Sequence, residues 1–232
     1  MKIVGIMGAM PEEVELICTA LNDVTQEEYA GVTYHYGNLH TIRVVVACGG
    51  MGKANAASTT QVLATRYNAE AILFSGIAGN MTNKLHIGDV AISHELLYHD
   101  AEDRMLEQSA PGTALYRADT TLIQAACDAC SFAGVPFLVG RIATGDKFVG
   151  DPVLKKKIKD RFHPLCVEME GAAVAQISLR NKLPFVVIRA ISDNSDESID
   201  ALGGMEFDIS EYTKTASAIV LRMVYLLAHK TD

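Results

Sequence analysis

The chain has 232 residues, of which 49% are hydrophobic and 21% are charged, and it carries a net charge of −8 with a pI near 5.4. This balance is typical of a globular protein with a substantial core, so disordered and fibrous classes are excluded. The acidic charge argues against a broad basic surface for nucleic acid, and no uncharged apolar run is long enough to span a membrane.

In chain order, the hydrophobic pattern predicts alternating strands and helices. We expect a strand at 3–7, a helix from Pro11, a hairpin of strands 33–36 and 43–47 around Gly37-Asn38, a helix at 53–67, strands at 71–74 and 89–93, a helix at 119–133, a strand at 137–143, helices at 153–161 and 171–181, a strand at 185–191 and a helix at 209–228. The pattern predicts one α/β domain over residues 1–232, with three α/β/α layers around a mixed, mostly parallel sheet.

The cysteines are odd in number and thinly spread: Cys18, Cys48, Cys127, Cys130 and Cys166. This usage is typical of buried thiols in a reducing compartment. Cys127 and Cys130 form a C-x-x-C pair, but they fall inside a predicted helix, which favours a structural role over redox or metal chemistry. The first residues lack a signal-type apolar region, so we expect a cytoplasmic protein.

Polar or glycine-rich segments follow several of the predicted strands. They are Glu13, the turn Gly49-Gly50-Met51-Gly52, the turn Gly76-Ile77-Ala78-Gly79, Glu168-Met169-Glu170, and Ser192-Asp193-Asn194. Each segment alone is explained by a helix cap or a turn. In open α/β sheets, however, ligands bind beyond the carboxyl ends of the strands, so their convergence predicts a site.

Neither glycine turn matches a nucleotide-binding fingerprint. Gly52-Lys53 is followed by Ala54 where a P-loop requires Ser or Thr, and Asn55 stands where the dinucleotide motif needs its third glycine. What the turns offer is close approach of backbone to a small ligand.

The acidic residues suggest recognition of hydroxyl groups. If the carboxylate of Glu168 or Glu170 is buried near the edge of the sheet, it must be paired or bind something polar, and sugar hydroxyls are suitable donors. On a strand these two glutamates share a face, whereas in a helical turn they diverge. Arg189 and Asp193 share a face of the predicted strand 185–191 if it continues, and an Arg–Asp pair there would favour the ionised acid, whereas burial would favour the protonated one.

Four segments in this order resemble the purine nucleoside phosphorylase superfamily: Gly8-Ala9-Met10 with Glu12-Glu13, Gly76 to Gly79, Val167 to Gly171, and Arg189 to Asp193. Within it the chain is similar, from Met1 to about His229, to the 5′-methylthioadenosine/S-adenosylhomocysteine nucleosidases. The resemblance implies a nucleoside phosphorylase-like fold and hydrolysis of the bond between adenine and ribose. It implies no cofactor and a homodimer with a subunit-shared site.

The resemblance also implies roles for residues. Asp193 is the acid that protonates the five-membered ring of the purine, with Ser192 orienting it, and Glu13 holds the attacking water. Glu170 accepts hydrogen bonds from the ribose hydroxyls and favours an oxocarbenium-like sugar. The substrate-binding positions are Met169 on the sugar, Phe148 and Val149 on adenine, Phe207 over the ribose, and Met10 and Met51 on the sulfur-bearing side; we add Ile77, Glu168 and Arg189 from the segments above, and Asp103.

Two positions depart from the family pattern. Ile77 replaces the hydroxyl residue of the superfamily turn, and the segment 71–75 offers no arginine, so water is favoured over phosphate as nucleophile. Asp103 stands where an apolar residue is common, in a stretch that reaches the neighbouring subunit's site in the family. A charge there would alter affinity for the thioalkyl tail.

Two further interpretations concern the acidic loop and the histidines. Residues 195–208 form either a solvated acidic loop or a lid that is hinged at Gly203-Gly204 and brings Phe207 over the substrate. The histidines are scattered, and His94 and His99 have no evident third ligand, so we expect no metal.

Other functions remain open at this stage. An aminofutalosine-type nucleosidase would use the same residues and differ in its tail pocket. A phosphate-dependent purine nucleoside phosphorylase is the next alternative, followed by a non-catalytic nucleoside-binding relative. A binding relative would not need an acid and a water base together, so the presence of Glu13, Glu170 and Asp193 favours an enzyme. We expect it to act on adenosine thioethers in methionine salvage, with 5′-deoxyadenosine as a further substrate.

Overall fold

The computed structural model describes residues 3–195 and 209–229. Its elements are β1 (Ile3–Gly8), η1 (Pro11–Glu13), α1 (Glu15–Ala20), β2 (Asn22–Tyr29), β3 (Val32–Leu39), β4 (Ile42–Cys48), α2 (Lys53–Thr65), β5 (Ala71–Asn80), β6 (Val90–Tyr98), α3 (Asp103–Glu107), β7 (Tyr116–Arg117), α4 (Thr120–Ala133), β8 (Phe137–Thr144), α5 (Pro152–Phe162), β9 (Cys166–Glu168), α6 (Gly171–Arg180), β10 (Phe185–Asp193) and α8 (Ser210–Ala228).

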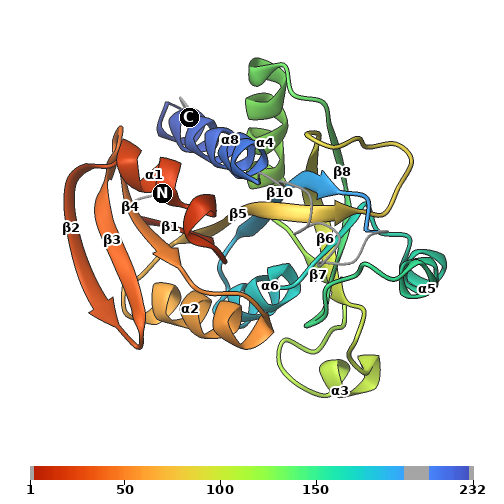
Figure 1. The fold of residues 1–232 in the computed structure, drawn as a ribbon. Coiled ribbons are helices and arrows are strands. Elements are labelled where there is room, and N and C mark those ends of the chain that lie inside the picture. The colour runs from red at the N-terminus through yellow and green to blue at the C-terminus, as the bar shows by residue number, and fades with distance from the viewer. Residues whose placement is uncertain (1–2, 196–208, 230–232) are drawn as a thin grey trace.

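Helices cover both faces of one sheet, as expected for three α/β/α layers (Figure 1). The helices α1, α4 and α8 lie on one face, where α8 packs against β5 and β10, and α2 and α6 pack together on the other. The strand β10 runs through the middle with every residue buried, which explains why its first half, residues 185–188, is apolar without alternation. The α/β class and the mixed sheet are confirmed.

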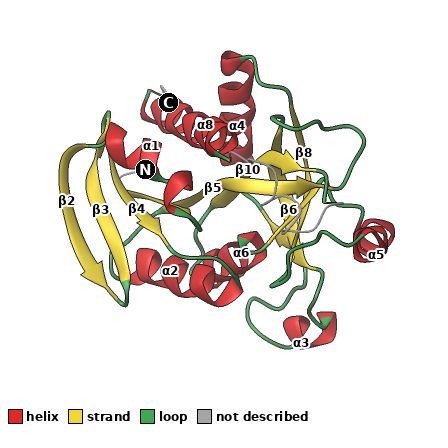
Figure 2. Ribbon diagram, viewed as in Figure 1, coloured by secondary structure: helices red, strands yellow, loops and turns green. Residues whose placement is uncertain are grey.

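The sheet contains as many antiparallel as parallel pairings, fewer parallel ones than we expected. Parallel pairs are β1–β4, β1–β5, β5–β10, β6–β8 and β8–β9, and antiparallel pairs are β2–β3, β3–β4, β5–β9, β6–β7 and β6–β10. Because β10 pairs with both β5 and β6, the strands β5, β10, β6, β8 and β9 close into a ring (Figure 2). This ring brings the ends of β9 and β10 together beside β5.

The predicted hairpin turn at Gly37-Asn38 is wrong. Both residues lie inside β3 and pair with β4, and the chain turns after Leu39, where His40 adopts a positive φ of 56°. Gly37 is needed for close packing instead, because a Cβ there would lie 2.8 Å from the carbonyl oxygen of Asn22. The preceding strand β2 was not predicted at all.

The predicted turn Gly76-Ile77-Ala78-Gly79 is also wrong, since these residues continue β5 to Asn80. The glycine at position 76 makes room for charged side chains. A Cβ built on Gly76 would lie 1.9 Å from Nη1 of Arg189 and 2.5 Å from Oε1 of Glu13. Because Gly76 has no side chain, the Arg189 guanidinium and the Glu13 carboxylate can both pack against the backbone of β5.

We predict that Gly76→Ala destabilises the fold by about 3 kcal/mol or more, because the methyl group displaces a buried ion pair. Urea unfolding measures the loss. Gly31→Ala is the matched control: nothing lies within 4 Å of its Cβ, but φ is +77°. The control should lose only about 1–2 kcal/mol, the cost of a left-handed conformation. Equal losses in the two variants would contradict the packing argument.

Candidate active site

A fully buried arginine joins acidic side chains from several parts of the fold. The guanidinium of Arg189 donates to Oε2 of Glu168, lies 3.4 Å from Oε2 of Glu170, and lies 3.9 Å from Oε1 of Glu13. Its other face stacks 4.1 Å above the ring of Phe74. A buried charge is tolerated only when it is paired, so Arg189 and the acidic groups must be placed together. We call these four charged residues the Arg189 network.

Glu13 is held at the end of η1 by backbone donors on both carboxylate oxygens. Oε2 accepts the N–H of Ala9 at 2.6 Å and that of Met10 at 3.1 Å, and Oε1 accepts the N–H of Ile77 at 3.1 Å. Burial raises the pKa of the Glu13 carboxyl, and Arg189 and these amides oppose the rise. The side chain is therefore immobilised beside β5 in a setting suited to exchanging a proton.

Glu170 stands between β9 and α6, one residue before the helix begins. Its Oε1 accepts the N–H of Gly52 at 2.7 Å, from the glycine turn before α2. Burial and the nearby charge of Glu168 raise the pKa of Glu170 to about 7, against the opposing effect of Arg189 and the Gly52 amide. This carboxyl therefore changes its charge near neutral pH.

The carboxylate of Glu168 makes its hydrogen bonds within the protein. Its Oε1 accepts a hydrogen bond from Thr144, and its Oε2 accepts the N–H groups of Glu170 and Gly171 in addition to Arg189. With these partners it fixes the start of α6 and the position of Arg189. Neither of the two geometries considered for Glu168 and Glu170 applies, since one ends a strand and the other precedes a helix.

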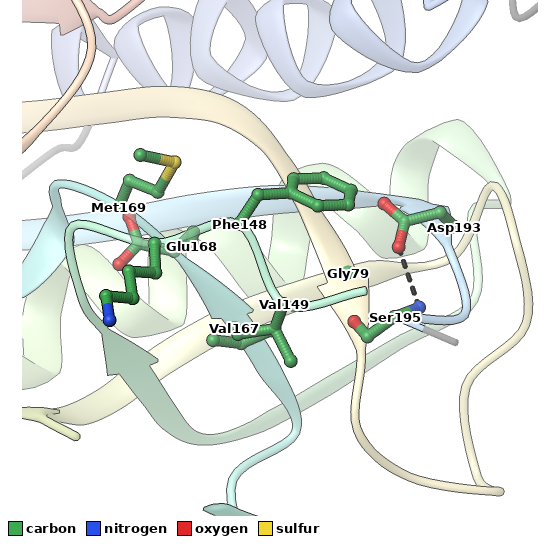
Figure 3. Close-up of a pocket in the computed structure, with 9 residues that line it drawn as sticks. Gly79, Phe148, Val149, Val167, Glu168, Met169, Asp193 and Ser195 are labelled. Carbon is green, nitrogen blue, oxygen red and sulfur yellow. Dashed lines mark hydrogen bonds between the residues drawn. The ribbon is translucent and has the colours of Figure 1, made fainter. Parts of the chain in front are cut away.

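Asp193 ends β10, and its two oxygens are both engaged. Oδ2 accepts the hydroxyl of Ser192 at 2.9 Å. Oδ1 accepts the N–H of Ser195 at 2.7 Å, the hydrogen bond drawn in Figure 3. The pair between Arg189 and Asp193, one of the two arrangements considered from the sequence, does not form. The ladder of β10 with β5 shifts register between Ile191 and Asp193, and Arg189 pairs with glutamates instead. The irregularity breaks the alternation on which that prediction depended.

A pocket beside Asp193 collects residues that are distant in the sequence (Figure 3). Of the predicted positions, it is lined by Phe148, Val149, Glu168, Met169 and Asp193. An aromatic ring, a thioether and the Asp193 carboxylate offer a stacking surface and a polar anchor, the composition expected of a small-molecule site. The Glu168 carboxylate also lines the pocket but is occupied by contacts within the protein.

Sequence reasoning missed four residues of the pocket wall: Gly79, Lys147, Val167 and Ser195. Gly79 belongs to the glycine segment that the sequence analysis singled out, and Lys147 directly precedes the predicted site residue Phe148. Both residues could therefore have been predicted from their neighbours. Ser195 begins the segment 195–208 that we interpreted as a loop or a lid, but it was not assigned to the site. The chain brings it back toward Gly79 after β10 ends, where a Cβ on Gly79 would lie 2.0 Å from its Oγ.

Glu13, Glu170 and Arg189 meet in the Arg189 network and Ser192 contacts Asp193, but none of these four residues lines this pocket. The other predicted positions are dispersed. Met10 and Ile77 border the site through their amides on Glu13, whereas Met51 is 62% exposed. Asp103 lies on α3, where its carboxylate is 3.5 Å from Arg161 and away from the pocket of its own chain. Phe207 and the acidic loop beyond Ser195 lie outside the described residues.

Residues 3–195 and 209–229 contain no cluster of three or more His, Cys, Asp or Glu side chains arranged to hold a metal ion. In the same ranges, no helix has the length and apolar character needed to cross a membrane. Cys127 and Cys130 lie within α4 as expected, and all five cysteines are free.

Comparison with known proteins finds the same architecture. The family model described as the phosphorylase superfamily matches residues 3–225. The 5′-methylthioadenosine/S-adenosylhomocysteine nucleosidase of Bacillus licheniformis is 38% identical, covering 97% of this chain and 98% of the relative. Among solved structures, the corresponding nucleosidase of Neisseria meningitidis with methylthio-immucillin-A superposes with a TM-score of 0.89 at 31% identity, covering 97% and 99% of the two chains.

A second type of structure is also similar. The futalosine hydrolase of Helicobacter pylori has a TM-score of 0.89 at 28% identity, and the match covers 97% of each chain. The match to the superfamily model spans nearly the whole chain. Sequence identity above 30% to the Bacillus licheniformis nucleosidase, over nearly the full length of both proteins, identifies the family within that superfamily. The chain belongs to the phosphorylase superfamily and, within it, to the family of the 5′-methylthioadenosine/S-adenosylhomocysteine nucleosidases.

Proposed function

We propose that the protein hydrolyses the N-glycosidic bond of 5′-methylthioadenosine and S-adenosylhomocysteine, and that of 5′-deoxyadenosine, releasing adenine and the corresponding sugar. The near full-length relatives named as such nucleosidases support this activity. The observation that carries the choice of water as nucleophile is the Glu13 carboxylate bound to the amide of Ile77.

The proposed mechanism divides the chemistry between two ends of the substrate. Adenine leaves poorly as an anion, so Asp193 donates a proton to its five-membered ring as the bond to the ribose breaks and the electron pair moves onto the base. Ser192 holds Asp193 in place through the hydrogen bond to Oδ2. Phe148 stacks on adenine, and the backbone of Val149 reads its edge.

At the sugar end, Glu170 accepts hydrogen bonds from the ribose hydroxyls and stabilises the positive charge that develops on the sugar. Glu13 orients a water molecule, takes one of its protons, and leaves the oxygen to bond to the anomeric carbon. Met169 packs on the sugar, and Met10, Met51 and Phe207 surround the thioalkyl side. In this scheme Arg189 and Glu168 position the carboxylates that contact substrate.

The geometry around β5 supports hydrolysis over phosphorolysis. A phosphate bound at the glycine segment would require backbone N–H donors and positive charge. Here the N–H of Ile77 already donates to Glu13, and Arg189 is surrounded by three glutamates. A phosphate dianion would therefore meet carboxylate charge where it needs donors.

A futalosine-type substrate is the second possibility, and the similarity to the Helicobacter pylori futalosine hydrolase favours testing it. The two substrate classes share the ribose and differ in the tail at the 5′ position. The two classes are distinguished by letting methylthioadenosine and aminofutalosine compete for the same enzyme. The substrate with the higher kcat/KM carries the 5′ tail that the site prefers.

We further propose that the enzyme is a cytoplasmic homodimer in methionine salvage. The five free thiols support a reducing compartment. The separation of Asp103 from the pocket of its own chain supports the idea that α3 reaches the site of a second copy. Sedimentation of the purified protein tests the dimer.

The first experiment is adenine release from methylthioadenosine in phosphate-free buffer and then with phosphate added. We expect the same rate in both buffers and free methylthioribose as the sugar product, because Glu13 supplies water. Strict dependence on phosphate with a sugar phosphate as product would overturn the proposed nucleophile. No release in either buffer would overturn the thioadenosine substrate.

We predict that Asp193→Asn lowers kcat by roughly 10²- to 10⁴-fold, the usual contribution of a general acid. The amide keeps the shape of the side chain but has no acidic proton to transfer to the purine. Steady-state kinetics measures the loss, and thermal unfolding verifies the fold. Asp160→Asn, at the exposed end of α5, serves as the control with wild-type kinetics. Near-normal turnover of Asp193→Asn would remove the residue from its role.

We predict that kcat/KM falls as the pH is lowered through about 7, the pKa to which burial and Glu168 raise Glu170. Protonated Glu170 is the weaker acceptor for the ribose hydroxyls, so the active form lies above this value. The pH profile of kcat/KM checks this. In Glu170→Gln the fall of kcat/KM at low pH, the acid limb of the profile, should vanish, and activity should be low at every pH. A wild-type profile that stays flat for about two pH units on either side would contradict the assignment.

A further inference from the structure

Three charged side chains from separate segments meet at the start of α2. Lys53, the first residue of α2, donates from Nζ to both carboxylate oxygens of Asp100 at 2.9 Å, and it lies 3.4 Å from Oδ2 of Asp146. Asp100 follows β6, and Asp146 follows β8. The side chains of Lys53 and Asp100 are each about three-quarters buried. We call these residues the Lys53 cluster.

Backbone hydrogen bonds tie the same residues together. The N–H of Lys53 donates to Oδ1 of Asp146 at 2.8 Å, and the N–H of Asp146 donates to Oδ2 of Asp100 at 2.9 Å. An isolated exposed ion pair contributes little to stability, but charge-assisted bonds to two backbone amides fix the backbone as well as the side chains. The Lys53 cluster therefore sets the relative position of three chain segments.

Two of those segments carry groups of the proposed site. The N–H of Gly52, adjacent to Lys53, donates to Oε1 of Glu170 at 2.7 Å. Two residues after Asp146 comes Phe148, which lines the pocket. The cluster thus lies between the donor that holds the sugar-binding carboxylate and the ring that stacks on the base.

The helix α2 needs an outside partner at this end. Its first turn is preceded by Gly52, which has no side chain to accept the free N–H groups and adopts a φ of 92°. Asp146 supplies the missing acceptor from another segment, and its negative charge suits the positive end of the helix. Because a Cβ on Gly52 would lie 3.3 Å from Oδ1 of Asp146, the two segments approach closely.

We propose that the Lys53 cluster is a positioning device, in which Lys53 sets both the Gly52 amide on Glu170 and the Phe148 segment for catalysis. This rests on the proposed function, in which Glu170 and Phe148 contact the nucleoside. Lys53 touches neither substrate nor reacting atoms, and it acts through the backbone.

The prediction for pH dependence follows from what surrounds Glu170. Glu168 from β9, Arg189 from β10, Glu13 from η1 and the Gly52 amide from the start of α2 face it. The amide favours the ionised carboxyl. If the amide moves away while the other three groups stay in place, the pKa of Glu170 rises further, and the acid limb of kcat/KM moves to higher pH.

The test compares Lys53→Met, which keeps the length of the side chain without its charge, with Lys156→Met, which removes an exposed lysine paired with Asp160 on α5. We expect kcat/KM of Lys53→Met to fall by about 10- to 100-fold, the effect of a small misplacement of reacting groups. Its acid limb should move up by about half a pH unit or more. Lys156→Met should keep wild-type values, and thermal unfolding shows that each variant is folded.

A readout independent of turnover separates this proposal from the proposed function. The amide resonance of Gly52 in an NMR spectrum reports the titration of its acceptor, Glu170. We expect its midpoint to rise in Lys53→Met and in Asp100→Asn, which removes the charge of the partner instead. Unchanged Gly52 titration in both variants would overturn the positioning role, whatever the substrate. Altered titration in a protein that releases no adenine would overturn the proposed function alone.

Discussion

The buried charge of Arg189 is the constraint on which the rest of the site depends. A guanidinium without exposure to water has to be matched by anions, and here it is matched by glutamates that arrive from η1, β9 and the start of α6. Each of these segments is therefore fixed in direction as well as in position. With more acidic groups than basic ones in the network, a carboxyl with a pKa near neutrality is an expected result.

The closed ring of β5, β10, β6, β8 and β9 provides the rigid support that this arrangement requires. A strand that pairs on both sides is held against sliding, and β10 carries Arg189 and Asp193 only a few residues apart. The local change of register after Ile191 separates their roles, since it leaves the arginine in the core and turns the aspartate to the pocket. One strand thus serves both the charge network and the proposed proton donor.

Most of the layer architecture could be predicted because the apolar run at 185–191 and the helical pattern at 209–228 are unambiguous locally. The strand β2 was missed because its residues are polar and almost all exposed, so it lacks the alternation that marks a half-buried strand. The segment after Phe74 was misassigned because glycine signals a turn in sequence, whereas at Gly76 it accommodates side chains from elsewhere. The partners of Arg189 depend on a bulge and on long-range contacts, which local patterns do not encode.

The carboxylate that occupies the amide of Ile77 has a thermodynamic consequence for the proposed reaction. Phosphorolysis conserves the energy of the glycosidic bond in a sugar phosphate and is readily reversed. Cleavage by water produces a free sugar in a solvent that is present in vast excess, so the step runs in one direction. In the proposed reaction, the hydrogen bond between Ile77 and Glu13 therefore favours committed removal of the nucleoside over a reversible exchange.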